Sequence, residues 1–116
     1  MPEGVALNRA IGCLLGQVVG DSLGSLVEFR SPQDSARQYP DGVRDLADGG
    51  TWNTIAGQPT DDSELALDLA RTLVGQTSWS SETVAAAYAG WSASRPFDIG
   101  GTTRQALSAA AATAQD

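Results

Sequence analysis

The segment from Ala10 to Val19 is the most apolar stretch of the chain, and glycines recur every four residues within it and after it. These glycines are Gly12, Gly16, Gly20 and Gly24. A four-residue period places them on one ridge of a helix, so the sequence predicts a buried helix from about Val5 to about Gly24. Each helical glycine costs up to about 1 kcal/mol relative to alanine, which indicates that another backbone or a ligand approaches the ridge closely. A tight contact with a neighbouring helix is the expected cause.

This apolar segment lacks the features of a membrane span and of a signal peptide. Gln17 interrupts it, Asp21 closes it, and it is shorter than the roughly 20 apolar residues that a span needs. The start of the chain, Met1-Pro2-Glu3, has no basic region before the apolar run. We therefore expect no membrane partner and a cytoplasmic location.

A second helix is predicted from about Thr60 to Val74. Leu65, Leu69 and Leu73 recur every four residues and share one helix face. Thr60 precedes this pattern, so we expect its side chain to be the N-cap. The acids of the first turn are Asp61, Asp62 and Glu64.

The acidic first turn has two interpretations. Acids at this position complement the positive end of the helix dipole by a few tenths of a kcal/mol, roughly, with no ligand involved. Alternatively, Thr60, Asp61 and Asp62 offer three oxygens to a hard cation, and oxygen is the ligand type that Mg²⁺ and Mn²⁺ prefer. Spacing alone favours the first interpretation and leaves the second open.

Composition narrows the chemistry further. The chain has no histidine, no lysine and one cysteine, Cys13, which we expect to be a buried small apolar residue. Catalytic triads, a lysine Schiff base and a histidine or cysteine zinc site built from this chain alone are thereby excluded. Acid–base and metal chemistry must depend on carboxylates, hydroxyls and backbone groups. The net charge of −7 argues against nucleic acid and anionic lipid as partners.

The segment 31–59 is rich in turn-forming residues and is predicted to be a long loop with a short helix near 33–38. It carries Trp52, Asn53 and Thr54, and loops of this length in compact domains are usually functional or mobile. Ser80-Ser81-Glu82 is predicted to cap a further helix, which ends near Ser94.

Asp98 and the sequence Gly100-Gly101-Thr102 come before the last predicted helix. The glycines allow backbone N–H groups to approach a ligand, and the N-terminus of a helix favours an anion such as phosphate. The same pattern also occurs as ordinary turn and cap chemistry, which is the more frequent case.

Several of these motifs occur in a particular order. They are Gly12-Cys13-Leu14-Leu15-Gly16, Gly20-Asp21-Ser22-Leu23-Gly24, Glu28-Phe29, Gly57-Gln58-Pro59-Thr60-Asp61-Asp62-Ser63 and Asp98-Ile99-Gly100-Gly101-Thr102. In this order and at this spacing they resemble the N-terminal part of the ADP-ribosylglycohydrolase family, most closely its bacterial branch. The resemblance runs from about Leu7 to about Ala110.

The resemblance implies an all-α, orthogonally packed helical domain, of which residues 1–116 form the N-terminal part. It implies a pair of Mg²⁺ or Mn²⁺ ions and cleavage of the bond between ADP-ribose and a modified side chain, typically arginine, so that the partner is an ADP-ribosylated protein or ADP-ribose. By match to the family motifs, the metal ligands would be Thr60, Asp61 and Asp62. The catalytic acids would be Glu28 and Asp98. Asp21 would support the substrate site, and Gly100, Gly101 and Thr102 would line the diphosphate or ribose.

The chain departs from the family pattern in one respect. Members of the family are usually more than twice as long, and an Asp-x-Asp-Thr cluster near their C-terminus completes the metal site; no such cluster occurs here. The sequence therefore leaves two main functions open. One is a hydrolase that needs a missing C-terminal half or another copy of the chain. The other is a non-catalytic helical module that binds ADP-ribose, a metal or a protein partner, and a helical domain with no ligand is a third, less favoured reading.

Overall fold

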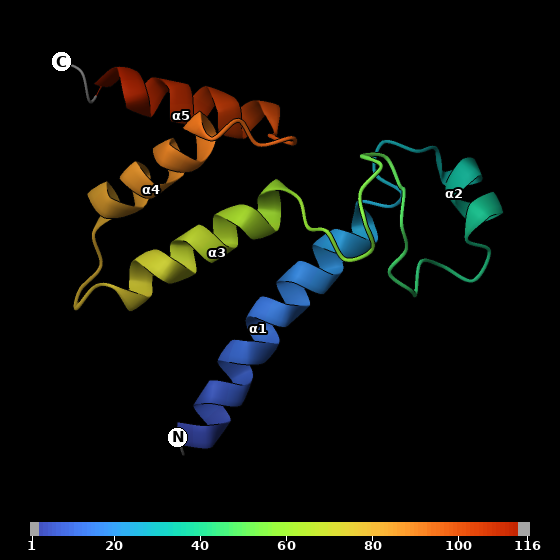
Figure 1. Cartoon of the computed structure of the whole chain (residues 1–116), viewed down its shortest axis with the longest axis horizontal. Coiled ribbons are helices and arrows are strands. Elements are labelled where there is room, and N and C mark those ends of the chain that lie inside the picture. Colours follow the sequence, from blue (N-terminus) through green and yellow to red (C-terminus); the bar gives the residue numbers. More distant parts are fainter. Residues whose placement is uncertain (1–2, 114–116) are drawn as a thin grey trace. The chain divides into compact units, whose positions relative to one another are not determined.

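The computed structural model describes residues 3–113, which form five helices and no strand (Figure 1). The helices are α1 (Glu3–Gly24), α2 (Pro32–Gln38), α3 (Asp61–Val74), α4 (Ser81–Ala93) and α5 (Gly101–Thr113). The predicted all-α class is confirmed, and each helix lies where the sequence predicts one. The chain divides into two compact units, Met1–Ser63 and Glu64–Asp116, which are described separately below.

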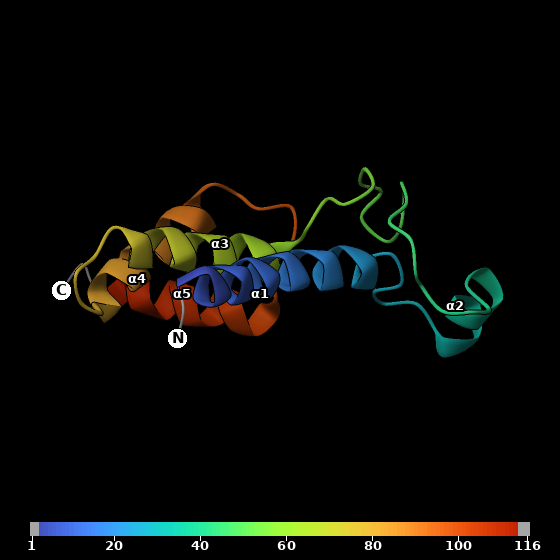
Figure 2. The same ribbon diagram turned by 90° about the horizontal axis from the view of Figure 1, so that it is seen from below.

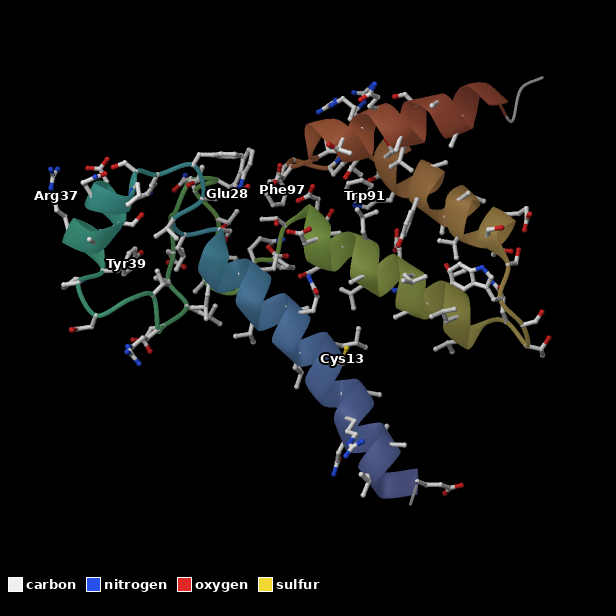
Figure 3. The ribbon with its side chains drawn as sticks, turned by 180° about the vertical axis from the view of Figure 1, so that it is seen from behind. Cys13, Glu28, Arg37, Tyr39, Trp91 and Phe97 are labelled. Atoms are coloured by element: carbon white, nitrogen blue, oxygen red, sulfur yellow. The ribbon has the colours of Figure 1, made fainter. Side chains whose placement is uncertain are left out.

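In the first unit, α1 ends at Gly24 as predicted and begins two residues before the predicted Val5, but it does not have the predicted burial. Ser22 is its one buried residue among those described, and Cys13, also expected to be buried, is exposed (Figure 3). Large apolar side chains along the helix are exposed as well: Val5, Leu7, Ile11, Leu14, Leu15 and Val19. The prediction of a buried helix is therefore wrong for this chain, because no described segment of its own unit covers these side chains.

Beyond α1 the chain makes a series of turns and then forms the short helix α2. Ser31 caps α2 by accepting a hydrogen bond from the N–H of Asp34 at 3.1 Å, and Pro32 occupies the first helical position, where its missing N–H costs nothing. In both Figure 1 and Figure 2, α2 lies away from α1.

The segment 39–60 links α2 to α3, and its residues 48–56, the 48–56 loop, contain a small hairpin. Gly49 and Thr54 exchange both backbone hydrogen bonds, at 2.8 and 3.0 Å, and Gly50 turns the chain with a φ of 72°. The N–H of Thr51 then donates to the carbonyl of Ser25 at 3.4 Å. The middle of a long loop is thereby attached to the turn that follows α1.

In the second unit, α4 and α5 pack against each other (Figure 2). The predicted cap of α4 is confirmed, since the hydroxyl of Ser80 accepts the N–H of Thr83 at 3.2 Å. Val84 and Trp91 are the buried residues of this helix. Trp91 also donates its indole N–H to Oε2 of Glu64 on α3, at 2.7 Å.

Among residues 3–113, none of the five helices combines the length and the apolar character that a membrane span requires.

The contact between Trp91 and Glu64 gives a first prediction. Trp91→Phe removes the hydrogen-bond donor from a side chain that is only 8% exposed, so we expect a loss of about 1–3 kcal/mol in the free energy of unfolding. Trp79→Phe is the matched control because Trp79 is 64% exposed, and it should change stability by less than about 0.5 kcal/mol. Urea unfolding of both variants measures the difference, and equal effects would contradict the prediction.

Candidate functional site

Asp21, near the end of α1, accepts four hydrogen bonds from residues at the start of α3. The N–H and the hydroxyl of Thr60 donate to Oδ2 and Oδ1, at 2.9 and 2.6 Å. The N–H and the hydroxyl of Ser63 both donate to Oδ2, at 3.2 and 2.5 Å. Thr60 and Ser63 are only 4% and 0% exposed, so water cannot readily replace these bonds. Asp21 therefore fixes the start of α3 against the end of α1.

This network corrects the predicted cap of α3. The N–H of Ser63, which the side chain of Thr60 was expected to satisfy, donates to the carboxylate of Asp21 instead. A carboxylate at this position also complements the positive end of the α3 dipole. The hydroxyl of Thr60 uses its only hydrogen to donate to Asp21, which leaves its oxygen lone pairs for another group.

A cavity of about 410 Å³ lies beside this network. Its lining combines the candidate residues Asp21, Glu28, Thr60 and Asp62 with one face of α1. That face contributes Gly16, Gln17, Gly20 and Gly24, and the turn after it contributes Ser25. The first unit therefore brings four of the predicted site residues together around one space.

The glycine ridge of α1 does not lie in the predicted environment, which was a tight contact with a neighbouring helix. Within the first unit, a Cβ placed on Gly12, Gly16, Gly20 or Gly24 would meet no atom within 4 Å, so no helix of this unit packs closely against the ridge. The predicted helix contact is therefore not found within the first unit. Instead, Gly16, Gly20 and Gly24 form a wall of the cavity, which agrees with the other interpretation, close approach of a ligand.

Glu28 lies just beyond the end of α1, where the chain has left the helix (Figure 3). Its Oε2 accepts a hydrogen bond from the indole N–H of Trp52, at 2.9 Å. Its backbone carbonyl accepts a hydrogen bond from the hydroxyl of Thr51. The 48–56 loop therefore holds both the backbone and the side chain of this candidate catalytic residue.

Negative charge accumulates at the cavity. Asp62 is exposed, but the slight burial of its carboxyl beside the cavity raises the pKa of that group above its ordinary value, and repulsion from Asp61, Asp21 and Glu28 raises this pKa further. A divalent cation would relieve this repulsion, because each carboxylate would then face a positive charge.

The donors present fit part of a metal site. Thr60, Asp61 and Asp62 would supply a hydroxyl oxygen and carboxylates, as Mg²⁺ and Mn²⁺ prefer. Within residues 3–113, however, no group of three or more His, Cys, Asp and Glu side chains is arranged to hold a metal ion. These three residues would therefore hold the ion on one side, and further ligands would have to come from water, substrate or other protein groups.

The remaining candidates belong to the second unit. Asp98 precedes α5, and Gly101 and Thr102 begin it. The carbonyl of Gly100 accepts the N–H of Arg104 at 2.9 Å, as expected for the residue before a helix. The predicted roles of Asp98 and of the glycines in substrate binding stay predictions.

Two residues at the site were not identified as site residues from the sequence. Ser63 follows the Thr60-Asp61-Asp62 motif, and its position in the first turn of the helix was a usable signal, since N–H and hydroxyl groups there need an acceptor. The sequence predicts only that Trp52 lies in a long loop. Nothing in its neighbourhood along the chain indicates a bond to Glu28, because the two residues are 24 positions apart.

Comparison with known proteins finds a family model and several relatives that all carry ADP-ribosyl hydrolase or glycohydrolase names. A family model described as ADP-ribosylglycohydrolase matches residues 2–116. The ADP-ribosyl-(dinitrogen reductase) glycohydrolase of Rhodospirillum rubrum is 39% identical over 101 residues, which are 86% of this chain and 34% of that protein. The ADP-ribosylarginine hydrolase Tri1 of Pseudomonas putida (strain GB-1) is 41% identical over 109 residues, 88% of this chain and 28% of the relative. Tri1 of Serratia proteamaculans (strain 568) is 33% identical over 114 residues, 92% of this chain and 30% of the relative. The chain thus spans about a third of the length of these curated relatives.

Proposed function

Because this chain belongs to the ADP-ribosylglycohydrolase family, we propose that it forms the first part of the active site of a metal-dependent ADP-ribosyl hydrolase. The bond cleaved is the N-glycosidic bond between ADP-ribose and a modified protein side chain. Arginine is the proposed acceptor, since relatives from two bacteria are named ADP-ribosylarginine hydrolases.

The observation that carries this proposal is the hydrogen-bonded network of Asp21. It uses both oxygens of that carboxylate to orient Thr60 and Ser63, so Asp21 acts as a support for the start of α3. Thr60 and Asp62 then line the same cavity as Glu28. Support by a second layer of residues is typical of metal sites, where it orients the ligands and tunes their charge.

The chemistry follows from the groups at the cavity. A cation held by Thr60, Asp61 and Asp62 would bind ribose hydroxyls and polarise a water molecule. Glu28 has one oxygen held by Trp52, and its other oxygen remains for proton exchange with the substrate or the attacking water. Asp98 is proposed as a second acid near the scissile bond, by its match to the family motif. The division of roles between Glu28 and Asp98 depends on their distances from the substrate.

The proposed activity requires ligands beyond those of the first unit. Thr60, Asp61 and Asp62 fill only part of an octahedral shell. We propose that a further segment with acidic residues completes the shell, supplied by the part of the family domain that the matched third does not include, or by another copy of the chain. A chain that binds ADP-ribose without cleaving it would be the non-catalytic alternative.

The test is release of ADP-ribose from an arginine-ADP-ribosylated protein by the 116-residue chain, with Mg²⁺ or Mn²⁺. With another copy of the chain supplying the missing metal ligands, we expect release that stops on addition of EDTA. Asp61→Asn removes a metal ligand and should lower the rate by at least about 100-fold, since even residues that only support metal ligands have effects of 10 to 100-fold.

Asp45→Asn is the matched control because it makes the same chemical change on an exposed loop residue, and it should leave the rate unchanged. Mn²⁺-dependent binding of ADP-ribose without release would indicate the non-catalytic alternative. If the chain neither releases nor binds ADP-ribose, the proposed function is overturned for this chain.

A further inference from the structure

Trp52 makes the one side-chain hydrogen bond described for the carboxylate of Glu28 within residues 3–113. Its indole N–H donates to Oε2 at 2.9 Å, and the contact is partly buried. An indole N–H is a donor only, so it always presents a hydrogen to the carboxylate and never repels it with a lone pair. A hydrogen bond to a charged group is also stronger than one between neutral groups.

The loop that carries Trp52 is attached to the same stretch of chain at other points. Thr51 donates its hydroxyl to the carbonyl of Glu28 and its N–H to the carbonyl of Ser25. At the far end of the loop, the N–H of Ala56 donates to Oδ1 of Asp48 at 2.8 Å. These bonds fix the loop as a unit, so the position of the indole ring is determined by the loop and not by Glu28 alone.

Phe29 completes the arrangement. Its ring meets Trp52 edge to face, with centroids 6.3 Å apart and an interplanar angle of 74°. Its backbone has a φ of 60°, a left-handed conformation that bulky residues rarely adopt. Such conformations persist only where the surroundings determine them, and they occur often at functional sites. Glu28 and Phe29 are neighbours in the chain, and both contact Trp52, one through its carboxylate and the other through its ring.

From these contacts we propose that Trp52 is a positioning residue, which holds the carboxylate of Glu28 at the cavity with Oε1 free for the substrate or for water. The catalytic part of this inference rests on the proposed function. The hydrogen bond between Trp52 and Glu28 is measured by a separate experiment. Without the indole, Glu28 would keep its charge and its place in the chain. It would lose its fixed orientation, because the turn after α1 fixes only its backbone.

The contact is tested by NMR on the ¹⁵N-labelled chain. The chain has three tryptophans, so it gives three indole N–H signals, which Trp→Phe variants assign. Glu28→Gln removes the charge from the acceptor and is expected to move the Trp52 signal, while the signals of Trp79 and Trp91 stay in place. Glu64→Gln is the matched control, because it should move the Trp91 signal alone.

In Glu28→Gln the amide oxygen can accept the same hydrogen bond, which would leave the Trp52 signal in place. Glu28→Ala then tests the contact, because alanine has no side-chain acceptor and the Trp52 signal should move. A Trp52 signal that neither variant moves would overturn the inference.

The contribution of Trp52 to catalysis is tested by Trp52→Phe in the hydrolysis assay. This variant keeps an aromatic ring against Phe29 and loses the donor. We expect kcat to fall about tenfold, the effect of one hydrogen bond to a charged group, with KM changed by less than about threefold. A merely structural role would lower the amount of folded protein and leave kcat per folded molecule unchanged. A Trp52→Phe variant as fast as the wild type would overturn the inference. If the wild type releases no ADP-ribose, the proposed function fails, and the NMR experiment still decides the contact.

Discussion

Replacing Asp21 by asparagine is expected to lower the free energy of unfolding by about 3 kcal/mol, since it disrupts hydrogen bonds to a charged, partly buried group. Asparagine has the same shape, but one of its two side-chain ends is an NH₂ donor. That donor must face a donor of Thr60 or Ser63, and both of these residues are buried. At least one buried N–H or hydroxyl is then left without an acceptor, and the start of α3 loses its cap.

One effect opposes this loss. Asp21 repels Asp62, and removing its charge relieves that repulsion. This gain is smaller, because Asp62 is exposed to solvent and repulsion across water amounts to about 1 kcal/mol or less. We therefore expect the loss of hydrogen bonds to determine the sign.

Urea unfolding followed by circular dichroism measures the effect of Asp21→Asn. Asp41→Asn is the control, because it makes the same change on an exposed loop residue and should cost less than about 0.5 kcal/mol. If Asp21→Asn costs no more than Asp41→Asn, the hydrogen-bond network does not fix the first turn of α3 to the end of α1.

The helices could be predicted from the sequence because their signals are local. The leucine spacing of α3 and the Ser80 cap of α4 each lie within a few residues, and the structure has both helices at the predicted positions. The same holds for the end of α1, where the apolar run gives way to turns near Gly24.

The cap of α3 could not be predicted in this way. A threonine before an acidic first turn is a typical N-cap, and the local pattern is satisfied by Thr60. The acceptor in the structure comes from Asp21, 42 residues before the N–H of Ser63 that it binds. A carboxylate competes better for that hydrogen than a hydroxyl does, since a charged acceptor forms the stronger bond. Only the tertiary arrangement brings it there.

Burial of α1 was inferred from hydropathy alone, and this is where the inference went wrong. A helix that is apolar on nearly all sides is usually surrounded by protein. Periodicity identifies such a helix, but it does not say which segments surround it. Leu7 and Leu15 are exposed, so the described part of the first unit does not supply the segments that would cover this helix.

The candidate site was predictable to the extent that its residues belong to motifs. Asp21, Glu28, Thr60 and Asp62 were all named from the sequence, and the structure gathers them around one cavity. The loop that holds Glu28 was not predictable, because it depends on backbone turns at glycines and on long-range contacts, among them the close approach of Gly50 to Leu26.

That contact gives the second large effect. Gly50→Ala is expected to lower the free energy of unfolding by about 3 kcal/mol, from a left-handed backbone and from overpacking together. The φ of Gly50 is 72°, and a Cβ there would lie 2.9 Å from the Cα of Leu26 and 3.2 Å from the carbonyl oxygen of Ser25. Both atoms belong to the backbone, so no side-chain rotation can relieve the contact. Leu26 is itself only 2% exposed and has little room to move.

Gly42→Ala separates the two causes. Gly42 has a similar φ of 83°, but a Cβ there would meet no atom within 4 Å, so only the backbone cost of about 1 kcal/mol is expected. The difference in unfolding free energy between the two variants, measured by urea titration, therefore reports the contact between the loop and Leu26. Gly50→Ala should also move the indole signal of Trp52, because the displaced loop carries that residue away from Glu28. Equal costs for the two variants would mean that the loop does not rest on Leu26, and the positioning of Glu28 by Trp52 would then lose its structural basis.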